Sequence, residues 1–413
     1  MIKQYTYKFR ICPNYEQTAY LHKQISYGRF VYNFFLGRAI NLYKYNNIKF
    51  NYYEFKKVLP LLKKGFPFLK EANSQSLQAS LKNLDAAFRN FFASRAKFPN
   101  FKKKINFAAV VIPQHFSIEG NSLYIPKLKT PLKVKFHRRV NETAKSISIT
   151  KSPSGKYYVN MLVEKVFTPL LRINKVSGID LGLKDFAAIT AGTDANNYNS
   201  IKIDNPKYLI KSQDKLKKLN RQFAKKTKGS KNKIKFRKRL AVLYERVANQ
   251  RKDFIHKLSW GIINDSQVIV LEDLNIKGMI KNRRLSKSIS DASWSMFNAQ
   301  LAYKSDWHGR DIFKVNRYYP SSKTCFKCGY IKDDLKLPTR FWYCPKCNAV
   351  HDRDINAGIN LFLEGIKFMV GRVSPEPALH YDNEPAPAEY APAGIHNTGY
   401  SRHMSKQEAP AIY

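Results

Sequence analysis

Two Cys-x-x-Cys pairs near the end of the chain constrain its fold more strongly than any other feature. They lie fifteen residues apart and consist of Cys325, Cys328, Cys344 and Cys347. Each pair can direct two thiolates at one ion, so the spacing predicts one structural zinc ion held by all four. Gly329 and Asn348 follow the pairs, at positions where a positive φ is commonly required. Because four thiolates saturate zinc, we expect the nearby His351 to be a surface residue.

The charge of the chain indicates what it binds. Its 413 residues include 73 Lys and Arg against 30 Asp and Glu, a net charge of +43, and 44% of them are hydrophobic. A chain this apolar folds, so the excess charge lies on a folded surface, and a nucleic acid is its natural partner. Residues 201–260 alone hold twenty Lys and Arg against four Asp and Glu. Periodic apolar residues there predict a basic helical hairpin over 205–260, interrupted at 228–230.

Several classes of protein are excluded by what the sequence lacks. It has no run of roughly eighteen apolar residues and no signal peptide at its start, so we expect no association with a membrane. It has neither a GxxxxGK[ST] phosphate loop nor a GxGxxG turn. Cys12 stands alone while the other four cysteines cluster, which favours a reducing compartment over a disulfide framework. We therefore expect a cytoplasmic, nucleoid-associated protein.

The first 170 residues predict β-structure interrupted by helices. Residues 2–11 alternate as a strand does, and short strand-like runs recur at 107–112, 122–125, 132–136, 146–150 and 156–163. Residues 16–98 have helical spacing instead. Their clearest apolar stripe, which should form core, consists of Leu77, Leu81, Leu84, Phe88, Phe91 and Phe92. Gln75 and Gln78 lie off this stripe and are candidates for contact with nucleic acid.

Three carboxylates occupy positions that favour metal-dependent chemistry. Asp180 lies in the strand-like GIDLG, Glu272 ends the apolar run VIVL, and Asp354 begins a helix after the cysteine pairs. Carboxylates that converge in this way repel one another until divalent cations neutralise them. The order strand Asp, strand Glu, helix Asp is that of an RNase H-like nuclease, which cleaves phosphodiesters with two Mg²⁺ ions.

Neighbouring acids leave other assignments open. Asp185, Asp273 and Asp352 compete for the same roles, although Asp273 should point to the opposite face of its strand from Glu272. Asp354 has an ordinary alternative explanation as the N-cap of its helix. Spacing alone does not choose among these possibilities.

The chain resembles the TnpB proteins, which are transposon-encoded RNA-guided DNA nucleases related to type V CRISPR effectors. The resemblance covers residues 1–366, and its motifs are KFRICPNYEQ, GRFVYN, LQASLKNLDAAFRNFF, FPNFKKK, GIDLGLKDFA, NQRKDFIHKLS, VIVLEDLNIKGM, YYPSSKTCFKCGY and CPKCNAVHDRDINAGINL. By motif, Asp180, Glu272 and Asp354 match the RuvC triad of the family, and the four cysteines match its zinc ribbon. Asn348 stands where the family more often has Gly, and Gly358 where it more often has Ala.

The resemblance implies a multidomain α+β fold. A β-barrel wedge domain, residues 1–15 and 99–170, would carry a helical recognition insertion at 16–98. An RNase H-like (RuvC) α/β nuclease domain would span 171–320 and resume in a last helix at 351–370. The zinc ribbon, 321–350, would interrupt it. Residues 371–413, rich in Pro and Ala, would form a disordered tail.

The implied activity is RNA-guided cleavage of double-stranded DNA next to a short motif, by Mg²⁺-dependent hydrolysis at a single RuvC site. A guide RNA from the transposon end and the target DNA would be its partners, and the protein would be monomeric in the ribonucleoprotein. One structural Zn²⁺ and two catalytic Mg²⁺ would be its cofactors. Gln75 or Gln78 would contact the adjacent motif, because glutamine can bond adenine bidentately.

Four alternatives share part of this pattern. They are a DNA-binding regulator that does not cut, a transposase or transposase accessory protein, a CRISPR effector and an RNA-binding housekeeping protein. The last of these leaves the three carboxylates unexplained. A tyrosine-based single-strand transposase is disfavoured, because the sequence contains no His-x-His pair.

Overall fold

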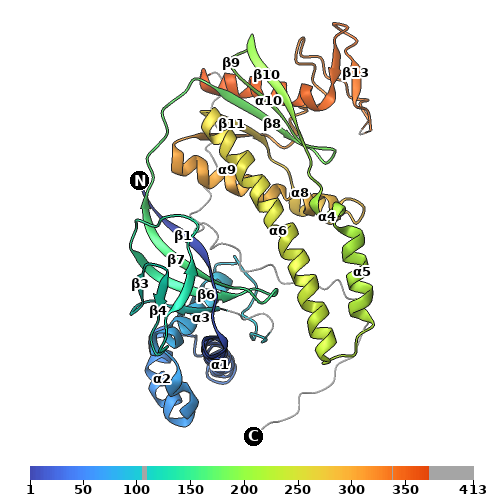
Figure 1. Ribbon diagram of the computed structural model, residues 1–413. Helices are drawn as coiled ribbons and strands as arrows, with labels where there is room; N and C mark the ends of the chain where they lie inside the picture. Colours follow the sequence, from blue (N-terminus) through green and yellow to red (C-terminus); the bar gives the residue numbers. More distant parts are fainter. Residues whose placement is uncertain (105–108, 337, 372–413) are drawn as a thin grey trace.

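The computed structural model describes residues 1–104, 109–336 and 338–371. These residues form a multidomain α+β protein with two large sheets. A curled sheet and its helices make one end of the molecule, a five-stranded sheet makes the other, and the long helix α6 runs between them (Figure 1). Within the described ranges, no helix has the length and apolar character needed to cross a membrane.

The curled sheet joins the first strand of the chain to strands more than 100 residues later. Its order is β2-β6-β7-β1-β5-β4-β3, with β1 (Ile2–Ile11) antiparallel to both of its neighbours. The others are β2 (Ala109–Ile112), β3 (Ser117–Glu119), β4 (Ser122–Tyr124), β5 (Leu132–Lys135), β6 (Ala144–Lys151) and β7 (Tyr157–Val166). The predicted strands are confirmed, β3 was missed, and the predicted start at Phe107 lies outside the described residues.

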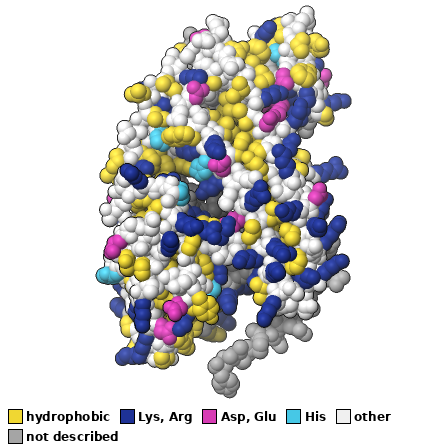
Figure 2. Space-filling view, in the orientation of Figure 1, with side chains coloured by type: hydrophobic (Ala, Val, Ile, Leu, Met, Phe, Trp, Pro, Cys, Tyr) yellow, Lys and Arg dark blue, Asp and Glu magenta, His cyan; other side chains and the backbone are white. Residues whose placement is uncertain are grey.

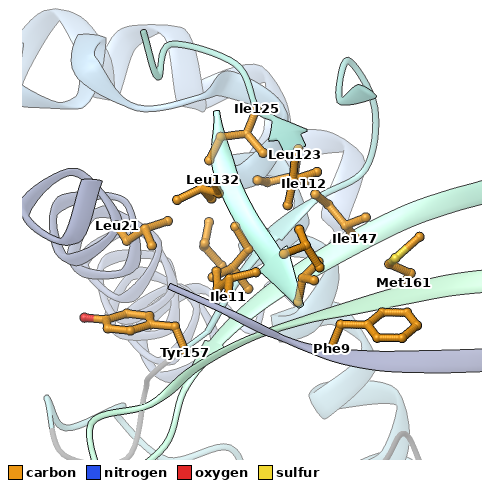
Figure 3. Close-up of a cluster of buried hydrophobic side chains, with 14 of the residues drawn as sticks. Phe9, Ile11, Leu21, Ile112, Leu123, Ile125, Leu132, Ile147, Tyr157 and Met161 are labelled. Carbon is orange, nitrogen blue, oxygen red and sulfur yellow. The ribbon is translucent and has the colours of Figure 1, made fainter. Parts of the chain in front are cut away.

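Alternation along the strands fills the core of the curled sheet. In β1, Tyr7, Phe9 and Ile11 are buried, whereas Arg10 is exposed. Figure 3 shows Phe9 and Ile11 packed with Met161 and Tyr157 and with Leu21 from the first helix. This period of two matches the apolar pattern that predicted the strands.

Three α-helices and one 3₁₀ turn interrupt this sheet after β1. They are α1 (Tyr15–Asn46), α2 (Tyr52–Gly65), η1 (Pro67–Glu71) and α3 (Ser74–Phe92). The side chain of Asn14 caps α1 in a reciprocal capping box with Gln17. The predicted stripe of α3 is buried as far as Phe88, but Phe92 is 62% exposed. That part of the prediction was wrong, because Phe92 is the last residue of α3 and lies beyond the buried part of the helix face.

The five-stranded sheet has the order β10-β9-β8-β11-β12. Its strands are β8 (Val176–Leu181), β9 (Asp185–Asp194), β10 (Asn197–Asp204), β11 (Val268–Glu272) and β12 (Asp311–Val315). β8, β9 and β10 form an antiparallel meander, whereas β11 is parallel to both β8 and β12. The sequence predicted β8, β9 and β11 but not the two edge strands.

Helices cover both faces of the five-stranded sheet. Along β11, Ile269 and Leu271 pack toward α6 (Lys231–Asp265) and α9 (Trp294–His308), whereas Val268 and Val270 pack toward α10 (Arg353–Met369). Short helices α4 (Tyr208–Lys211), α7 (Ile276–Met279) and α8 (Ser286–Ala292) fill the connections. Helices α5 (Gln213–Ala224) and α6 form the predicted hairpin and share an apolar cluster that includes Leu216 and Leu240.

Glycines let α10 lie unusually close to the sheet. A Cβ at Gly178 of β8 would lie 2.2 Å from the backbone nitrogen of Phe362 and 2.5 Å from the carbonyl oxygen of Gly358. A Cβ at Gly365 would lie 2.5 Å from Val176 Cγ1. Gly358 therefore lies at a tight helix–sheet contact, which gives a structural reason for glycine at that position beyond its effect on helix propensity.

Replacing Gly178 by Ala should destabilise the protein by roughly 1–3 kcal/mol or more, because the new methyl group meets backbone atoms that cannot rotate away. Thermal unfolding measures the effect. Gly261→Ala in α6 is the matched control: nothing lies within 4 Å of its Cβ position. That change should stabilise by about 1 kcal/mol through helix propensity. Equal melting temperatures for the two variants would contradict the close contact between β8 and α10.

Candidate functional site

Asp180 and Glu272 lie next to each other at one edge of the five-stranded sheet. β8 and β11 are parallel neighbours, and their register pairs Ile179 with Leu271, one residue before the two acids. Val176, Val268 and Val270 face α10, so the alternation of a strand points Asp180 and Glu272 to the same side. Both carboxylates therefore leave the sheet toward α10.

Asp354 lies in the first turn of α10, the helix that packs on this face of the sheet. The N-cap is Asp352, whose carboxylate accepts hydrogen bonds from the backbone nitrogens of Asp354 and Ile355, both at 3.1 Å. The alternative that Asp354 acts as the N-cap was therefore wrong. Its carboxylate is left for contacts beyond the helix, on the side where β8 and β11 end.

Electrostatics place the three carboxylates in one group. Burial raises the pKa of Asp180 well above its usual value, and the negative charges of Glu272 and Asp354 raise it further. Burial also raises the pKa of Glu272, although the hydroxyl of Ser321 donates a hydrogen bond to it at 2.5 Å and opposes the shift. Two buried acids with raised pKa values, beside a third acid, form a site that gains stability from bound positive charge.

The competing acids each have a cationic partner. Asp273 lies 2.6 Å from Arg317, and Asp352 lies 2.7 Å from Lys202. Asp185 lies 3.8 Å from the same lysine. Asp354 also has cationic neighbours, so the charge it exerts on Asp180, and not a lack of counter-charge, groups it with Asp180 and Glu272.

The four cysteines form a second group, in the segment between β12 and α10. Their sulfur atoms all lie within 4.8 Å of one another, and the two nearest pairs are 3.4 Å and 3.6 Å apart. A tetrahedral zinc ion with Zn–S bonds of about 2.3 Å places its sulfurs about 3.8 Å apart, so the geometry fits zinc. A disulfide would need an S–S distance of about 2.05 Å. Gly329 and Asn348 have φ of 74° and 56°, as expected.

Three family models match parts of the chain. The IS605 OrfB model, described as a probable transposase, matches residues 156–283, and a Cas12f1-like TNB domain matches 294–361. A helix-turn-helix domain matches 1–48. A relative from Streptomyces pristinaespiralis, named "Putative RNA-guided DNA endonuclease", is 34% identical over 87% of this chain and 89% of its own. The chain belongs to the TnpB family.

Two further similarities agree with this assignment. The E. coli K12 protein InsQ, also named as an RNA-guided DNA endonuclease, is 29% identical to this TnpB chain over 67% of it and 70% of its own length. The fold resembles the Cas12f1 chain of a cryo-EM complex with guide RNA and target DNA, with a TM-score of 0.53 and 15% identity over 84% of this chain and 83% of that one. The residues matched by the helix-turn-helix model fold here as one strand, β1, and one helix, α1.

The expectation that His351 is a surface residue was wrong for this TnpB chain. His351 is only 2% exposed, and its Nε2 lies 3.0 Å from the sulfur of Cys325. The cause is a hairpin of β13 (Phe341–Tyr343) and β14 (Val350–Asp352), which pairs His351 with the buried Trp342. A histidine at this distance from a cysteine sulfur can orient that sulfur as a metal ligand without replacing it.

Several site residues of the TnpB chain were missed from sequence because they lie apart from the acids in the chain. Arg340 and Lys202 lie 3.4 Å and 3.9 Å from the carboxylate of Asp354. Asn356 and Asn360 of α10 each donate hydrogen bonds to the carbonyl oxygens of residues 321 and 324. Two asparagines one turn apart on an otherwise apolar helix face are the sequence signal that could have predicted this contact between α10 and the segment at 321–324.

The two predicted DNA contacts of the TnpB chain lie on α3, at the other end of the molecule from α10 (Figure 1). Gln75 and Gln78 are both partly exposed. Gln75 donates a hydrogen bond to Gln114 at 3.0 Å. Their role in reading DNA stays a prediction.

Proposed function

We propose that this protein is an RNA-guided DNA endonuclease of a bacterial or archaeal insertion sequence. The observation that carries the proposal is the convergence of Asp180, Glu272 and Asp354 from β8, β11 and α10. The names of the relatives, as RNA-guided DNA endonucleases, support the activity. The net charge of +43 supports polyanionic partners. The cell compartment we propose is the cytoplasm, at the nucleoid.

The two sheets support the finer fold assignment. An antiparallel β8–β9–β10 meander beside parallel β11 and β12 is the arrangement of an RNase H-like, RuvC-type domain, and its acids lie on the two central strands and the packed helix. The curled sheet would be the wedge domain, and α1 to α3 the recognition insertion. The domain boundaries given above from sequence remain part of this proposal.

Mg²⁺ fits the carboxylate group in its chemistry. Its preferred ligands are carboxylate oxygens and water. Asp180 and Glu272 lie on neighbouring strands, and the charge of Asp354 raises the pKa of Asp180. Two ions about 3.5–4 Å apart are the usual arrangement for cleavage of a phosphodiester by carboxylate-held metals. When bound, such ions would activate a water molecule and stabilise the leaving oxygen.

The surrounding residues would position the substrate and the ligands. The Ser321 hydroxyl donates a hydrogen bond to Oε1 of Glu272. This bond lowers the pKa of Glu272 and so favours its ionised form. Arg340 and Lys202, beside Asp354, bring positive charge to where a scissile phosphodiester would lie, which favours the more negative transition state. Because a single site can hold one strand at a time, the two DNA strands would be cut in turn.

Sequence recognition would be divided between RNA and protein. Base pairing between the guide RNA and the target strand would read the sequence, while the protein reads a short adjacent motif. Gln75 and Gln78 are our candidates for that reading, through adenine. The zinc ribbon, packed on the start of α10 through Asn356 and Asn360, would help admit the strand to the acids.

The decisive test is to express the protein with the DNA that flanks its gene, purify it in high salt and sequence the RNA that remains bound. A discrete RNA ending in flanking sequence is expected, and it should direct Mg²⁺-dependent cleavage of a matching duplex. Random fragments, or none, would contradict the guided activity. Binding of the matching duplex without cleavage would instead indicate the regulator or transposase accessory role.

Replacing Ser321 by Ala should raise the Mg²⁺ concentration needed for half-maximal cleavage by roughly tenfold or more. The variant loses the hydroxyl that lowers the pKa of Glu272, so a proton competes better with the cation. Its backbone carbonyl keeps the bonds from Asn356 and Asn360, so the loop should stay in place. Cleavage should recover at saturating Mg²⁺, and an unchanged Mg²⁺ dependence would argue against this role.

A further inference from the structure

Side chains from five separate parts of the chain meet where α6 docks on the hairpin between β6 and β7. We call this group the lysine junction, and its members are His22, Lys104, Lys151, Tyr157 and Lys238. Lys151 Nζ and Tyr157 Oη each lie 2.6 Å from Nε2 of His22. Lys238 Nζ lies 3.8 Å from the Cβ position of Gly155, at the tip of the hairpin. The junction is far in sequence from the cysteines and the acids.

The histidine in this group does not neutralise the lysine beside it. An ammonium group can only donate, so Nε2 of His22 must accept from Lys151, and the imidazole is neutral with its proton on Nδ1. The hydroxyl of Tyr157, which is buried, lies 2.6 Å from the same nitrogen and shares its single lone pair with the ammonium group. His22 and Tyr157 therefore orient Lys151 and supply no negative charge to offset it.

The nearby carboxylate is already engaged. Glu245 lies two turns along α6 from Lys238, accepts a hydrogen bond from Tyr158 at 2.7 Å and pairs with Lys156 at 3.4 Å. Those contacts dock α6 on the hairpin. Across the residues that the structure describes, no carboxylate forms an ion pair with Lys104, Lys151 or Lys238.

Uncompensated positive charge therefore accumulates at the junction. Partial burial lowers the pKa of Lys151, and the charges of Lys238 and Lys104 lower it further. The pKa of His22 is lowered by burial and then by Lys151 and Lys104. Like charges held together by separate elements repel one another, and a bound anion removes that cost.

We propose that the lysine junction is a binding site for a phosphodiester group of a nucleic acid. This inference rests on the proposed function for its partner but concerns a place remote from the carboxylates. The ammonium groups of Lys104 and Lys238 are exposed, so a continuous strand can pass over them. Figure 2 shows Lys and Arg side chains gathered over α5 and α6 and around the hollow between these two helices and the curled sheet. The phosphodiester belongs either to the guide RNA or to the target DNA.

The test is a triple variant, Lys104→Gln, Lys151→Gln and Lys238→Gln, measured in two binding experiments over a range of NaCl concentrations. One uses the RNA that copurifies with the protein, transcribed in vitro, and the other uses the RNA-loaded protein and its matching duplex. Each lost phosphate contact should cost about fivefold in affinity near 0.15 M salt, or about a hundredfold for three. The slope of log K against log [salt] should fall in magnitude by about 2.7 if the contacts are to duplex DNA, or by about 2.1 if they are to a single strand. Loss in the first experiment assigns the site to RNA, and loss in the second assigns it to DNA.

The matched control is Lys133→Gln, Lys277→Gln and Lys281→Gln, which makes the same change in net charge at exposed lysines on β5, on α7 and just after α7. Binding by the junction variant that equals binding by this control in both experiments would overturn the proposal. The melting temperature of the nucleic-acid-free junction variant should equal or exceed that of the wild type, because repulsion is relieved. A lower melting temperature would assign the lysines a structural role instead. If the wild-type protein binds neither partner, the proposed function itself fails.

Discussion

DNA cleavage should fall by about 10³-fold or more when Asp180 is replaced by Asn, while RNA binding stays unchanged. The amide keeps the size of the side chain but removes the negative charge that a divalent cation requires. Asp180 is the acid whose pKa both other acids raise, so it lies electrostatically at the centre of the group. Cleavage of a matching duplex by the RNA-loaded protein, with Mg²⁺ varied, measures the loss.

The same substitution should raise the melting temperature of the metal-free protein. The pKa of Asp180 is higher in the folded state than its ordinary value of 3.8, so the unfolded chain releases the proton first as pH rises. The free energy of unfolding of the wild type therefore falls as the pH rises above 3.8. The variant has no ionisable group at this position, so its free energy of unfolding does not fall for this reason. The gain should be larger at pH 8 than at pH 4.

Asp273→Asn is the matched control for Asp180. Asp273 is adjacent to Glu272 in sequence, but its carboxylate is paired with Arg317 and points away from α10. This variant should cleave at close to the wild-type rate. Equal loss of activity in the two variants would show that the acids act as structure and not as a metal site.

Zinc removal should unfold the ribbon, residues 321–350, and abolish cleavage. The ribbon has a small apolar core of Cys325, Leu335, Trp342 and Cys344, two of which belong to the four-cysteine group. Metal binding in such a unit supplies about 10–16 kcal/mol of apparent free energy, which its side chains alone do not replace. Elemental analysis should find one zinc per chain, and Cys344→Ser should lose it.

Ribbon collapse should reach the acids through Ser321, which lies just before the first cysteine pair and donates to Glu272. The control is Cys12→Ser, because Cys12 is exposed and lies outside the cluster. That variant should keep its zinc and its activity. Retention of one zinc and of the wild-type melting temperature by Cys344→Ser would contradict a four-thiolate site.

Particular residues show which features the sequence predicts correctly. The cysteine spacing predicted a cluster that the structure brings together, because each Cys-x-x-Cys turn is a local structure set by neighbouring residues. Asp180 and Glu272 could be chosen as candidates because each lies at or near the end of an apolar strand, and strand alternation argued against Asp273. The choice between Asp352 and Asp354 was not settled from sequence, since both lie at the start of α10 and only the backbone hydrogen bonds show which one is the cap.

His351 and Phe92 show where the predictions failed. Burial of His351 depends on the pairing of β13 with β14, and exposure of Phe92 reflects its place at the end of α3, beyond the buried part of the helix face. Both depend on which other residues pack against the segment. Composition and periodicity report on one segment at a time, so they carry no information about which other segment covers it.

The sequence by itself determined the local features of this protein: the two Cys-x-x-Cys turns, the strands that carry acids near their ends, the basic hairpin and the net charge. Only the tertiary structure decided which charges meet. It placed Ser321 on Glu272, Arg340 beside Asp354, and three lysines from separate elements at one junction. The physical reason is that electrostatic interactions depend on distance in space, which the packing of α10 and α6 sets and no local pattern encodes.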